Sequence, residues 1–353
     1  MERPVRSSPA LMTLLSMAAI VVVVAGMRAA QSLVIPFLIA AFLAIICAPP
    51  LAWLRDKRVP TVVALIIVIS VASLVFVMFV VFAGASINDF RNNFDEMYAP
   101  YLNERTEKVI AWFDTYNIDI PENVIEQNLD TQRFMQFVVT LLGSAGSAFS
   151  NIFLVLLTLI FLLLEVSGFP KKLIAVSGGS TDTLERFREV TTAVRNYISI
   201  KTWVSLATGA VIYVWLKYLE VDYALLWGLL AFFFNFVPNI GSFIAAIPAV
   251  ALTYIKPGPT EALYAALGYV VVNVLVGNFI EPRLMGRGLG ISTLVVFISL
   301  VFWGWVLGPV GMLLSVPLTI IFKIIMEGSD ETRWLAVLLS ADPEPDDLSA
   351  AAK

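Results

Sequence analysis

The sequence predicts an all-α polytopic membrane protein, with about six spanning helices and two interrupted helical hairpins in an inverted-topology relation. Three observations lead to this fold class. Apolar residues make up 59% of the 353 residues and charged residues only 14%, whereas soluble domains contain roughly 45–50% and 25%. The apolar residues form runs about as long as a membrane-spanning helix. Two of these runs are interrupted near their centres by proline and glycine.

Uninterrupted apolar runs of about 20 residues can cross a bilayer as single helices. The chain holds them at residues 11–27, 32–54, 61–85, 149–166, 202–219 and 262–280. The first run, taken alone, could be a cleaved signal peptide. Because the second run follows after a short gap, we expect a retained pair of helices instead. Residues 1–85 then form an N-terminal group of transmembrane helices.

Basic residues are distributed unequally between the loops, and this asymmetry indicates the orientation of the chain. With the N-terminus in the cytoplasm, the short outer loops carry only Arg28, Lys217 and Lys256. The short inner loops then carry Arg3, Arg6, Arg55, Lys57, Arg58, Lys171, Lys172, Arg186, Arg188, Arg195, Lys201, Arg283, Arg287 and Lys323. Since cytoplasmic loops are rich in lysine and arginine, both termini are expected to be cytoplasmic.

Residues 86–147 would form an insert on the extracytoplasmic side. This insert contains ten acidic and four basic residues. Short amphipathic helices are expected there, with Leu102, Val109, Ile110 and Phe113 at helical spacing. Pro100 and Pro121 are expected to break them. A solvated cap that packs on the membrane domain is the simpler interpretation. A lid that receives a ligand is the alternative.

Residues 148–326 hold the remaining spans and are predicted to form the transmembrane core of the protein. Its inner loop, 167–201, contains Asp182 as a helix N-cap with Glu185 three residues later. Apolar residues from Leu184 onward share one face, so this helix is expected to lie at the inner surface and continue into the next span. Residues 327–353 form an acidic tail, expected in the cytoplasm, and its stretch Asp342-Pro343-Glu344-Pro345-Asp346-Asp347 is acidic and rich in proline, which is typical of disorder.

The two interrupted runs, 222–255 and 292–325, resemble each other and predict hairpins. The first contains Pro238, Asn239 and Gly241 at its break and Pro248 beyond it; the second contains Gly308, Pro309 and Gly311, then Pro317. A Trp-Gly pair precedes each break. The halves are short for full crossings, so we expect re-entrant hairpins or strongly tilted helix pairs. Since one crossing separates them, re-entrant hairpins would open to opposite sides as an inverted repeat. Proline and glycine are also common in ordinary membrane helices.

Broken helices free backbone polar groups, which can exist at membrane depth only inside protein or along a cavity. Polar side chains near the breaks are therefore candidates for a solute or ion path. Glu281 could bind and release a proton or cation, or form a structural pair with Arg283. The asparagines Asn235, Asn239, Asn273 and Asn278 both donate and accept hydrogen bonds, as a neutral hydroxylated solute requires. Hydrogen bonding between packed helices is the alternative.

Several function classes are disfavoured by composition. The chain has no histidine and one cysteine, Cys47, which argues against His-based catalysis and against a metal site. The net charge of −4 argues against nucleic acid as a partner. No Walker motif is present, and no span interior holds the paired aspartates of an intramembrane protease. We therefore expect a protein without a cofactor that is not an enzyme.

Taken together, three motifs of the C-terminal half resemble the autoinducer-2 exporter family of bacterial membrane transporters. They are Phe236-Val237-Pro238-Asn239-Ile240-Gly241, Gly277-Asn278-Phe279-Ile280-Glu281-Pro282-Arg283-Leu284-Met285-Gly286, and Gly308-Pro309-Val310-Gly311-Met312-Leu313-Leu314-Ser315-Val316-Pro317-Leu318. The resemblance implies hinge positions at the prolines and glycines of these motifs, including Pro282 and Gly286. It also implies a homo-oligomer, with a pentamer as one form. Ser292-Thr293 stands where relatives often carry His-Pro, so a mechanism that uses that histidine is not expected here.

These observations favour a secondary transporter of the bacterial inner membrane. We expect alternating access for a small polar solute, with coupling to protons through Glu281 as one version. A sodium or lithium/proton antiporter is the main alternative, because a carboxylate favours cation coupling. A channel and a non-transporting membrane scaffold are the other hypotheses. The expected partners are the solute or cation, the lipid bilayer and other copies of the chain.

Overall fold

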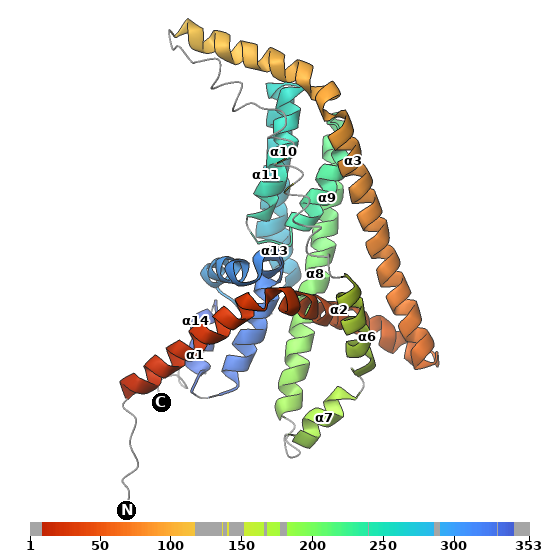
Figure 1. Cartoon of the computed structure of the whole chain (residues 1–353), viewed down its shortest axis with the longest axis vertical. Helices are drawn as coiled ribbons and strands as arrows, with labels where there is room; N and C mark the ends of the chain where they lie inside the picture. The colour runs from red at the N-terminus through yellow and green to blue at the C-terminus, as the bar shows by residue number, and fades with distance from the viewer. Residues whose placement is uncertain are drawn as a thin grey trace, which may run out of the picture.

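The computed structural model describes residues 9–116, 136, 140, 152–165, 168–176, 182–238, 240–285, 290–329 and 331–341. Within these ranges every named secondary-structure element is a helix. The one β-bridge there, between Ile291 and Ser340, is isolated. The predicted all-α class is therefore confirmed (Figure 1). Asn239, Gly286, Pro121 and the end of the acidic tail from residue 342 lie outside the described residues.

Long helices make up most of the described chain. In order they are α1 (Pro9–Ala29), α2 (Gln31–Asp56), α3 (Thr61–Thr115), α6 (Ile152–Glu165), α7 (Phe169–Val176), α8 (Asp182–Tyr218), α9 (Ala224–Phe234), α10 (Gly241–Ile255), α11 (Pro259–Leu275), a π-helical turn (Val276–Ile280), α12 (Glu281–Met285), α13 (Thr293–Glu327) and α14 (Arg333–Leu339). Five described stretches are long and apolar enough to cross a membrane, or six if the bent pair α6 and α7 is one span. This agrees with a polytopic membrane protein.

The predicted continuation of the helix that begins near Asp182 into the next apolar run is confirmed, because α8 runs unbroken for 37 residues. The predicted break at Pro100 is wrong, because α3 continues through it to Thr115. A proline inside a helix removes one hydrogen bond and adds one steric contact. The rest of this 55-residue helix is uninterrupted, so one lost bond does not end it.

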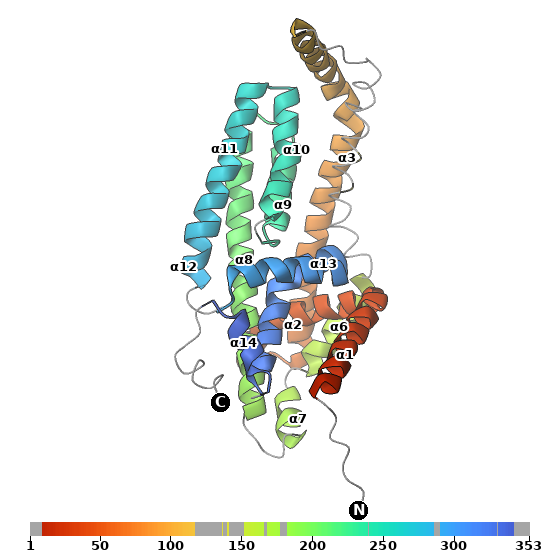
Figure 2. The ribbon, with the colours of Figure 1, turned by 90° about the vertical axis from the view of Figure 1, so that its left-hand side faces the viewer.

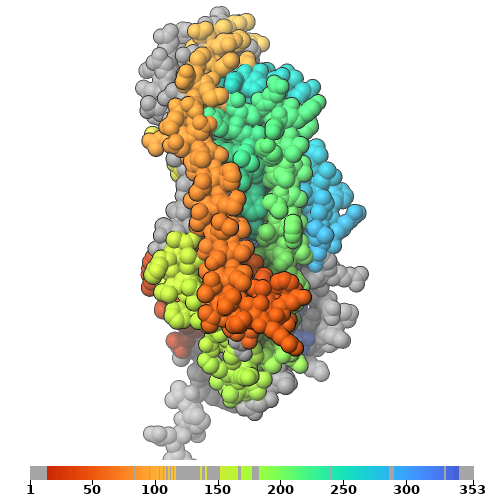
Figure 3. All heavy atoms as spheres, turned by 90° about the vertical axis from the view of Figure 1, so that its right-hand side faces the viewer, coloured from red at the N-terminus to blue at the C-terminus, as the bar shows by residue number. Residues whose placement is uncertain are grey.

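Apolar packing of the described residues is divided among three cores. The hairpin core joins the upper part of α3 to α8, α9, α10 and α11 and includes Trp227. The N-terminal core joins α2, the lower part of α3 and α6, and the α13 core joins α1, α2, the lower part of α8 and α13. Figure 2 shows α9, α10 and α11 at the upper end and α1, α2, α6, α13 and α14 at the lower end. Among the described helices, α3 and α8 have residues in cores at both ends, and Figure 3 shows α3 lying along one face of the molecule.

Both interrupted runs fold as pairs of packed helical arms. In the first, α9 and α10 are separated by residues 235–240, and Gly241 lies so close to the Phe234 carbonyl that a Cβ would overlap it. In the second, α13 bends at Gly308, whose φ of 64° is a left-handed conformation suited to glycine. Gly311 lies against the Trp303 carbonyl in the same manner as Gly241 against Phe234. The two hairpins therefore share a close backbone contact at a glycine, as an internal repeat would require.

Side-chain hydrogen bonds hold the two arms of α13 together. Ser299 Oγ donates to the Ser315 carbonyl at 2.9 Å and also contacts the Thr319 hydroxyl. Trp303 Nε1 donates to Thr319 Oγ1 at 3.3 Å. Because Ser299 and Trp303 precede the bend and the other two follow it, these bonds fix the arms against each other. The second hairpin is thus a stable unit with a satisfied polar interior.

Candidate functional site

A buried ion pair joins the end of the α11 segment to the middle of α8. Lys201 Nζ lies 2.5 Å from Glu281 Oε1, and the two side chains are only 5% and 18% exposed. Charged side chains are rarely buried to this degree unless they are paired. The pair is therefore the first candidate for a functional site among the described residues.

Local backbone geometry presents Glu281 at this position. After Leu275 the helix changes to the π-helical turn Val276–Ile280, and the Glu281 N–H donates to the Val276 carbonyl five residues earlier. Pro282 follows and has no N–H to donate. A π-helical turn rotates the residues beyond it relative to the preceding helix and often marks a functional site. Here it separates α11 from the carboxylate that reaches Lys201.

α8 and α11 lie side by side and run in opposite directions. Trp215 Nε1 donates to the Tyr264 carbonyl at 3.1 Å near one end, and Lys201 meets Glu281 near the other. From these two contacts we infer an antiparallel register that puts Asn273 about level with Thr208 of α8 and the π-helical turn about level with Ser205. The register therefore brings the predicted asparagine and the irregular turn to the same stretch of α8.

Three polar residues on α8 form what we call the polar stripe: Lys201, Ser205 and Thr208. They are 4%, 0% and 2% exposed and follow one another at helical-turn spacing. Ser205 Oγ accepts a hydrogen bond of 3.0 Å from Asn235 Nδ2, at the start of the break in the first hairpin. Thr208 donates to the Val204 carbonyl of its own helix. The polar stripe thus connects the broken hairpin to the ion pair.

The polar stripe lies between two apolar cores. On one side of it, Ile212 and Leu216 belong to the hairpin core. On the other side, Val194, Tyr197 and Ile198 belong to the α13 core. We call this polar stretch of α8, with Asn235 and Glu281, the seam. A boundary of polar contacts between two packed units is a place where such units could shift relative to each other.

The predicted site residues are distributed unevenly around the seam. Asn235 and Glu281 are part of it, and Asn273 is half-buried beside it. Asn278 and Arg283 are exposed, and Glu281 pairs with Lys201 rather than with Arg283. Asn239 lies outside the described residues. The structure therefore gathers half of the predicted polar set at one level of α8.

Most predicted hinge residues lie at or near the helix breaks, but Pro248 and Pro317 lie inside continuous helix, in α10 and in the second arm of α13. Gly241, Pro248, Gly311 and Pro317 are buried, Pro238 and Gly308 are half-buried, and Pro282 and Pro309 are exposed. Gly308 alone among them has a left-handed backbone conformation within the described ranges. Gly286 lies outside those ranges. Gly241 and Gly311 have the clearest role, because each permits the close backbone contact that closes a hairpin.

Sequence reasoning missed Lys201 and Ser205 as site residues. Lys201 was assigned to the inner loop as a charge that sets orientation. Its spacing from Val194, Tyr197 and Ile198 places it on the buried face of one continuous helix. That periodicity was a usable signal once the loop and the span are read together. Ser205 carries no comparable signal, since buried serines are common in membrane helices.

Comparison with known proteins places the chain among transport proteins. A family model described as "AI-2E family transporter" matches residues 15–330. "AI-2 transport protein TqsA" of Escherichia coli (strain K12) is 37% identical over 340 residues, covering 96% of this chain and 98% of that protein. A "Putative transport protein" of Haemophilus influenzae is 37% identical over 333 residues, or 93% and 95% of the two chains. "Putative transport protein YhhT" of Escherichia coli (strain K12) is 34% identical over 339 residues, or 96% and 97%.

Proposed function

Since the chain belongs to the AI-2E family of transporters, we propose that it moves a small polar solute across the bacterial inner membrane by alternating access. The observation that carries the proposal is the buried Lys201–Glu281 pair at the seam. A buried charge pair is costly, and an ionisable residue on a membrane-spanning segment is by default a candidate for a transport pathway. We also propose cytoplasmic termini, from the positive-charge asymmetry, and a homo-oligomer, from family resemblance.

The arrangement of the cores supports alternating access. Gly241 and Gly311 make the same kind of close backbone contact in the two hairpins, and each hairpin packs in a different core. Motion of one unit against the other at the seam would expose the polar stripe to one side and then to the other. Such inverted pairs of broken helices are typical of transporter binding sites.

A proton on Glu281 would change the balance between the states in which the polar stripe is open to one side of the membrane or to the other. While Glu281 is ionised, it neutralises the buried Lys201 ammonium 2.5 Å away. Protonation removes that attraction and leaves the lysine charge in a dry position, which is unfavourable. The protonated protein then favours an arrangement in which Lys201 meets water or an anionic group. A proton would thereby shift the population of states, as coupling requires.

The side chains around the seam suit a neutral, hydroxylated solute. Asn235 and Asn273 can both donate and accept hydrogen bonds, and Ser205 adds a hydroxyl. Autoinducer-2 is the first solute to test, because one relative is named an AI-2 transport protein. A sodium or lithium/proton antiporter is the second candidate, and the single carboxylate of Glu281 favours it. Among the described residues, no group of three or more His, Cys, Asp or Glu could hold a metal ion.

Proteoliposomes with an interior pH dye test these proposals. Purified protein would be exposed in turn to autoinducer-2, sodium and lithium. Proton movement only with autoinducer-2 supports proton-coupled solute transport, and movement with sodium or lithium supports antiport. Solute flux that does not saturate with concentration would indicate a channel. If labelled autoinducer-2, sodium and lithium all fail to move, the proposed function does not hold for these solutes.

A further inference from the structure

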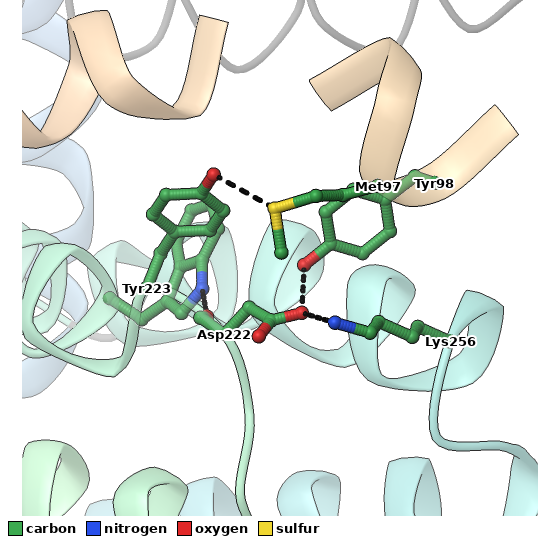
Figure 4. A network of polar contacts seen from close by, with 6 residues as sticks. Met97, Tyr98, Asp222, Tyr223 and Lys256 are labelled. Atoms are coloured by element: carbon green, nitrogen blue, oxygen red, sulfur yellow. Dashed lines mark hydrogen bonds and ion pairs between the residues drawn. The ribbon is translucent and has the colours of Figure 1, made fainter. Parts of the chain in front are cut away.

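An ion pair closes the open end of the first hairpin. Asp222 lies just before α9 and Lys256 just after α10, and Lys256 Nζ is 2.7 Å from Asp222 Oδ2 (Figure 4). The two side chains are 27% and 30% exposed. Trp227 Nε1 donates to the Asp222 backbone carbonyl at 3.0 Å, which fixes the first residue of the pair against α9. The hairpin base is thus tied across its two ends.

α3 contacts both ends of this base. The Tyr98 hydroxyl donates to Asp222 Oδ2 at 2.9 Å, and Lys256 Nζ lies 5.9 Å from the centre of the Tyr98 ring. Two turns further along α3, Arg105 Nε donates to the Ile255 carbonyl at 3.4 Å. We call the Tyr98, Asp222 and Lys256 contacts the clasp. α3 supplies one member and the hairpin supplies two.

Aromatic packing continues the contact below the clasp. Phe90, Phe94 and Tyr98 are 0%, 0% and 1% exposed. The Phe90 ring meets Tyr223 at 5.2 Å and Trp227 at 5.9 Å, both edge to face. Phe94 stacks on Tyr98 at 5.1 Å. Separation of α3 from the hairpin would expose these rings, which is strongly unfavourable in water.

The part of α3 below this contact is covered much less. Its N-terminal core contacts end near Ala72, and the hairpin core begins at Ile87. Between them the exposed apolar side chains include Leu74, Val75, Val77, Met78, Val80, Val81 and Phe82. Gly84 has open space where a Cβ would lie. α3 is therefore attached firmly at two places that are joined by a stretch with few contacts.

We infer that residues 87–105 of α3 are a strap that the clasp locks onto the first hairpin, so that strap and hairpin form one rigid unit. The clasp stays closed when this unit moves against the N-terminal and α13 cores. Motion is then taken up at the seam on α8 and at residues 73–86 of α3. The transport part of this inference rests on the proposed function, whereas the rigid unit itself does not.

Hydrogen exchange tests the rigid unit without any transport measurement. In the double variant Tyr98→Phe/Lys256→Met, the rate of amide hydrogen exchange should rise at least fivefold in residues 87–98 and in residues 224–234. The factor of increase should be similar in the two segments. Residues 152–165, in the N-terminal core, should be unchanged. Lys108→Met removes an exposed pair on the same helix and is the matched control. A rise in only one of the two segments, or in neither, would overturn the inference.

Cross-linking tests whether the clasp stays closed during transport. In a Cys47→Ala background, Tyr98→Cys and Lys256→Cys would be joined by a bifunctional thiol reagent, with completion verified by mass spectrometry. Solute flux should remain within twofold of the unlinked sample. Loss of flux with the clasp linked would contradict the inference. If unlinked protein moves no solute, the proposed function fails while hydrogen exchange still decides the rigid unit.

Discussion

Lys201 and Glu281 are eighty residues apart in the chain, yet their charged groups lie 2.5 Å apart at the seam between two apolar cores. The contact needs a continuous α8, a π-helical turn after α11 and a proline that follows the carboxylate. Each of these features is a departure from the simplest spanning helix. Their convergence on one ion pair is the main reason to assign the function of the protein to this point.

The ion pair should show strong coupling in a double-mutant cycle. Glu281→Gln or Lys201→Met alone leaves one buried charge without its partner and should lower the free energy of unfolding by about 3 kcal/mol. The double variant should recover most of this loss. Denaturation in detergent measures all three. Additive single effects would mean that the two charges do not depend on each other.

An exposed pair gives the matched comparison. Glu165 and Lys172 lie 2.6 Å apart, but their side chains are 46% and 69% exposed. Since surface pairs contribute little, Glu165→Gln should change the free energy of unfolding by less than about 1 kcal/mol. An effect as large as that of Glu281→Gln would show that burial is not what distinguishes the seam.

The two hairpin turns should respond alike to an added methyl group. In Gly241→Ala the new Cβ overlaps the Phe234 carbonyl, and in Gly311→Ala it overlaps the Trp303 carbonyl. Each change should lower the free energy of unfolding by about 2 kcal/mol or more, because backbone must move. Gly84→Ala is the control, since its Cβ meets open space and alanine favours helix by roughly 0.5–1 kcal/mol. Unequal tolerance of the two turns would count against an internal repeat.

The hydrogen bond at the hairpin break should affect transport more than stability. Ser205→Ala removes the acceptor of the 3.0 Å bond from Asn235 and should cost about 1 kcal/mol of folding free energy. If Asn235 contacts the solute at the seam, its freed amide would shift the KM for solute severalfold. Thr208→Val, which removes a hydroxyl bonded only within its own helix, is the control. Equal KM values in the two variants would mean that Asn235 does not contact the solute.

The clasp should weaken at alkaline pH. Burial first, and then the Asp222 carboxylate, raise the pKa of Tyr98 above its ordinary value, which is about 10. Because the folded state holds this proton more tightly than the unfolded state, the contribution is complete below about pH 10 and is lost as pH rises through the raised pKa. Unfolding midpoints between pH 8 and 11 should fall more steeply in wild type than in Tyr98→Phe. Parallel curves would contradict a clasp that depends on the Tyr98 proton.

Sequence reasoning predicted the membrane fold and the two broken hairpins because hydrophobic run length and proline and glycine positions are local signals. Glu281 and Asn235 were predicted for the same reason, as polar residues beside those breaks. Lys201 was missed because the local sequence around a lysine at a membrane edge looks the same whether the lysine faces water or a buried carboxylate. The clasp was missed because Tyr98 and Asp222 are 124 residues apart in the chain. Helical periodicity gives no information about contacts between residues so far apart.

Pro100 is the opposite case. A proline in an acidic, weakly periodic segment favours a helix break, yet α3 continues because its preceding residues, Phe90, Phe94 and Tyr98, are packed in the hairpin core. Tertiary contacts therefore overrode a local preference. The same contacts attach the strap, so the error and the further inference have one physical cause.

The most direct test of the account is proton movement driven by a solute gradient in proteoliposomes of wild type, Glu281→Gln and Glu165→Gln. Interior pH would be followed after addition of autoinducer-2 outside, with labelled solute measured in parallel. We predict a pH change in wild type and in Glu165→Gln, and none in Glu281→Gln. A pH change of wild-type size in folded Glu281→Gln would contradict a coupling role for the seam carboxylate.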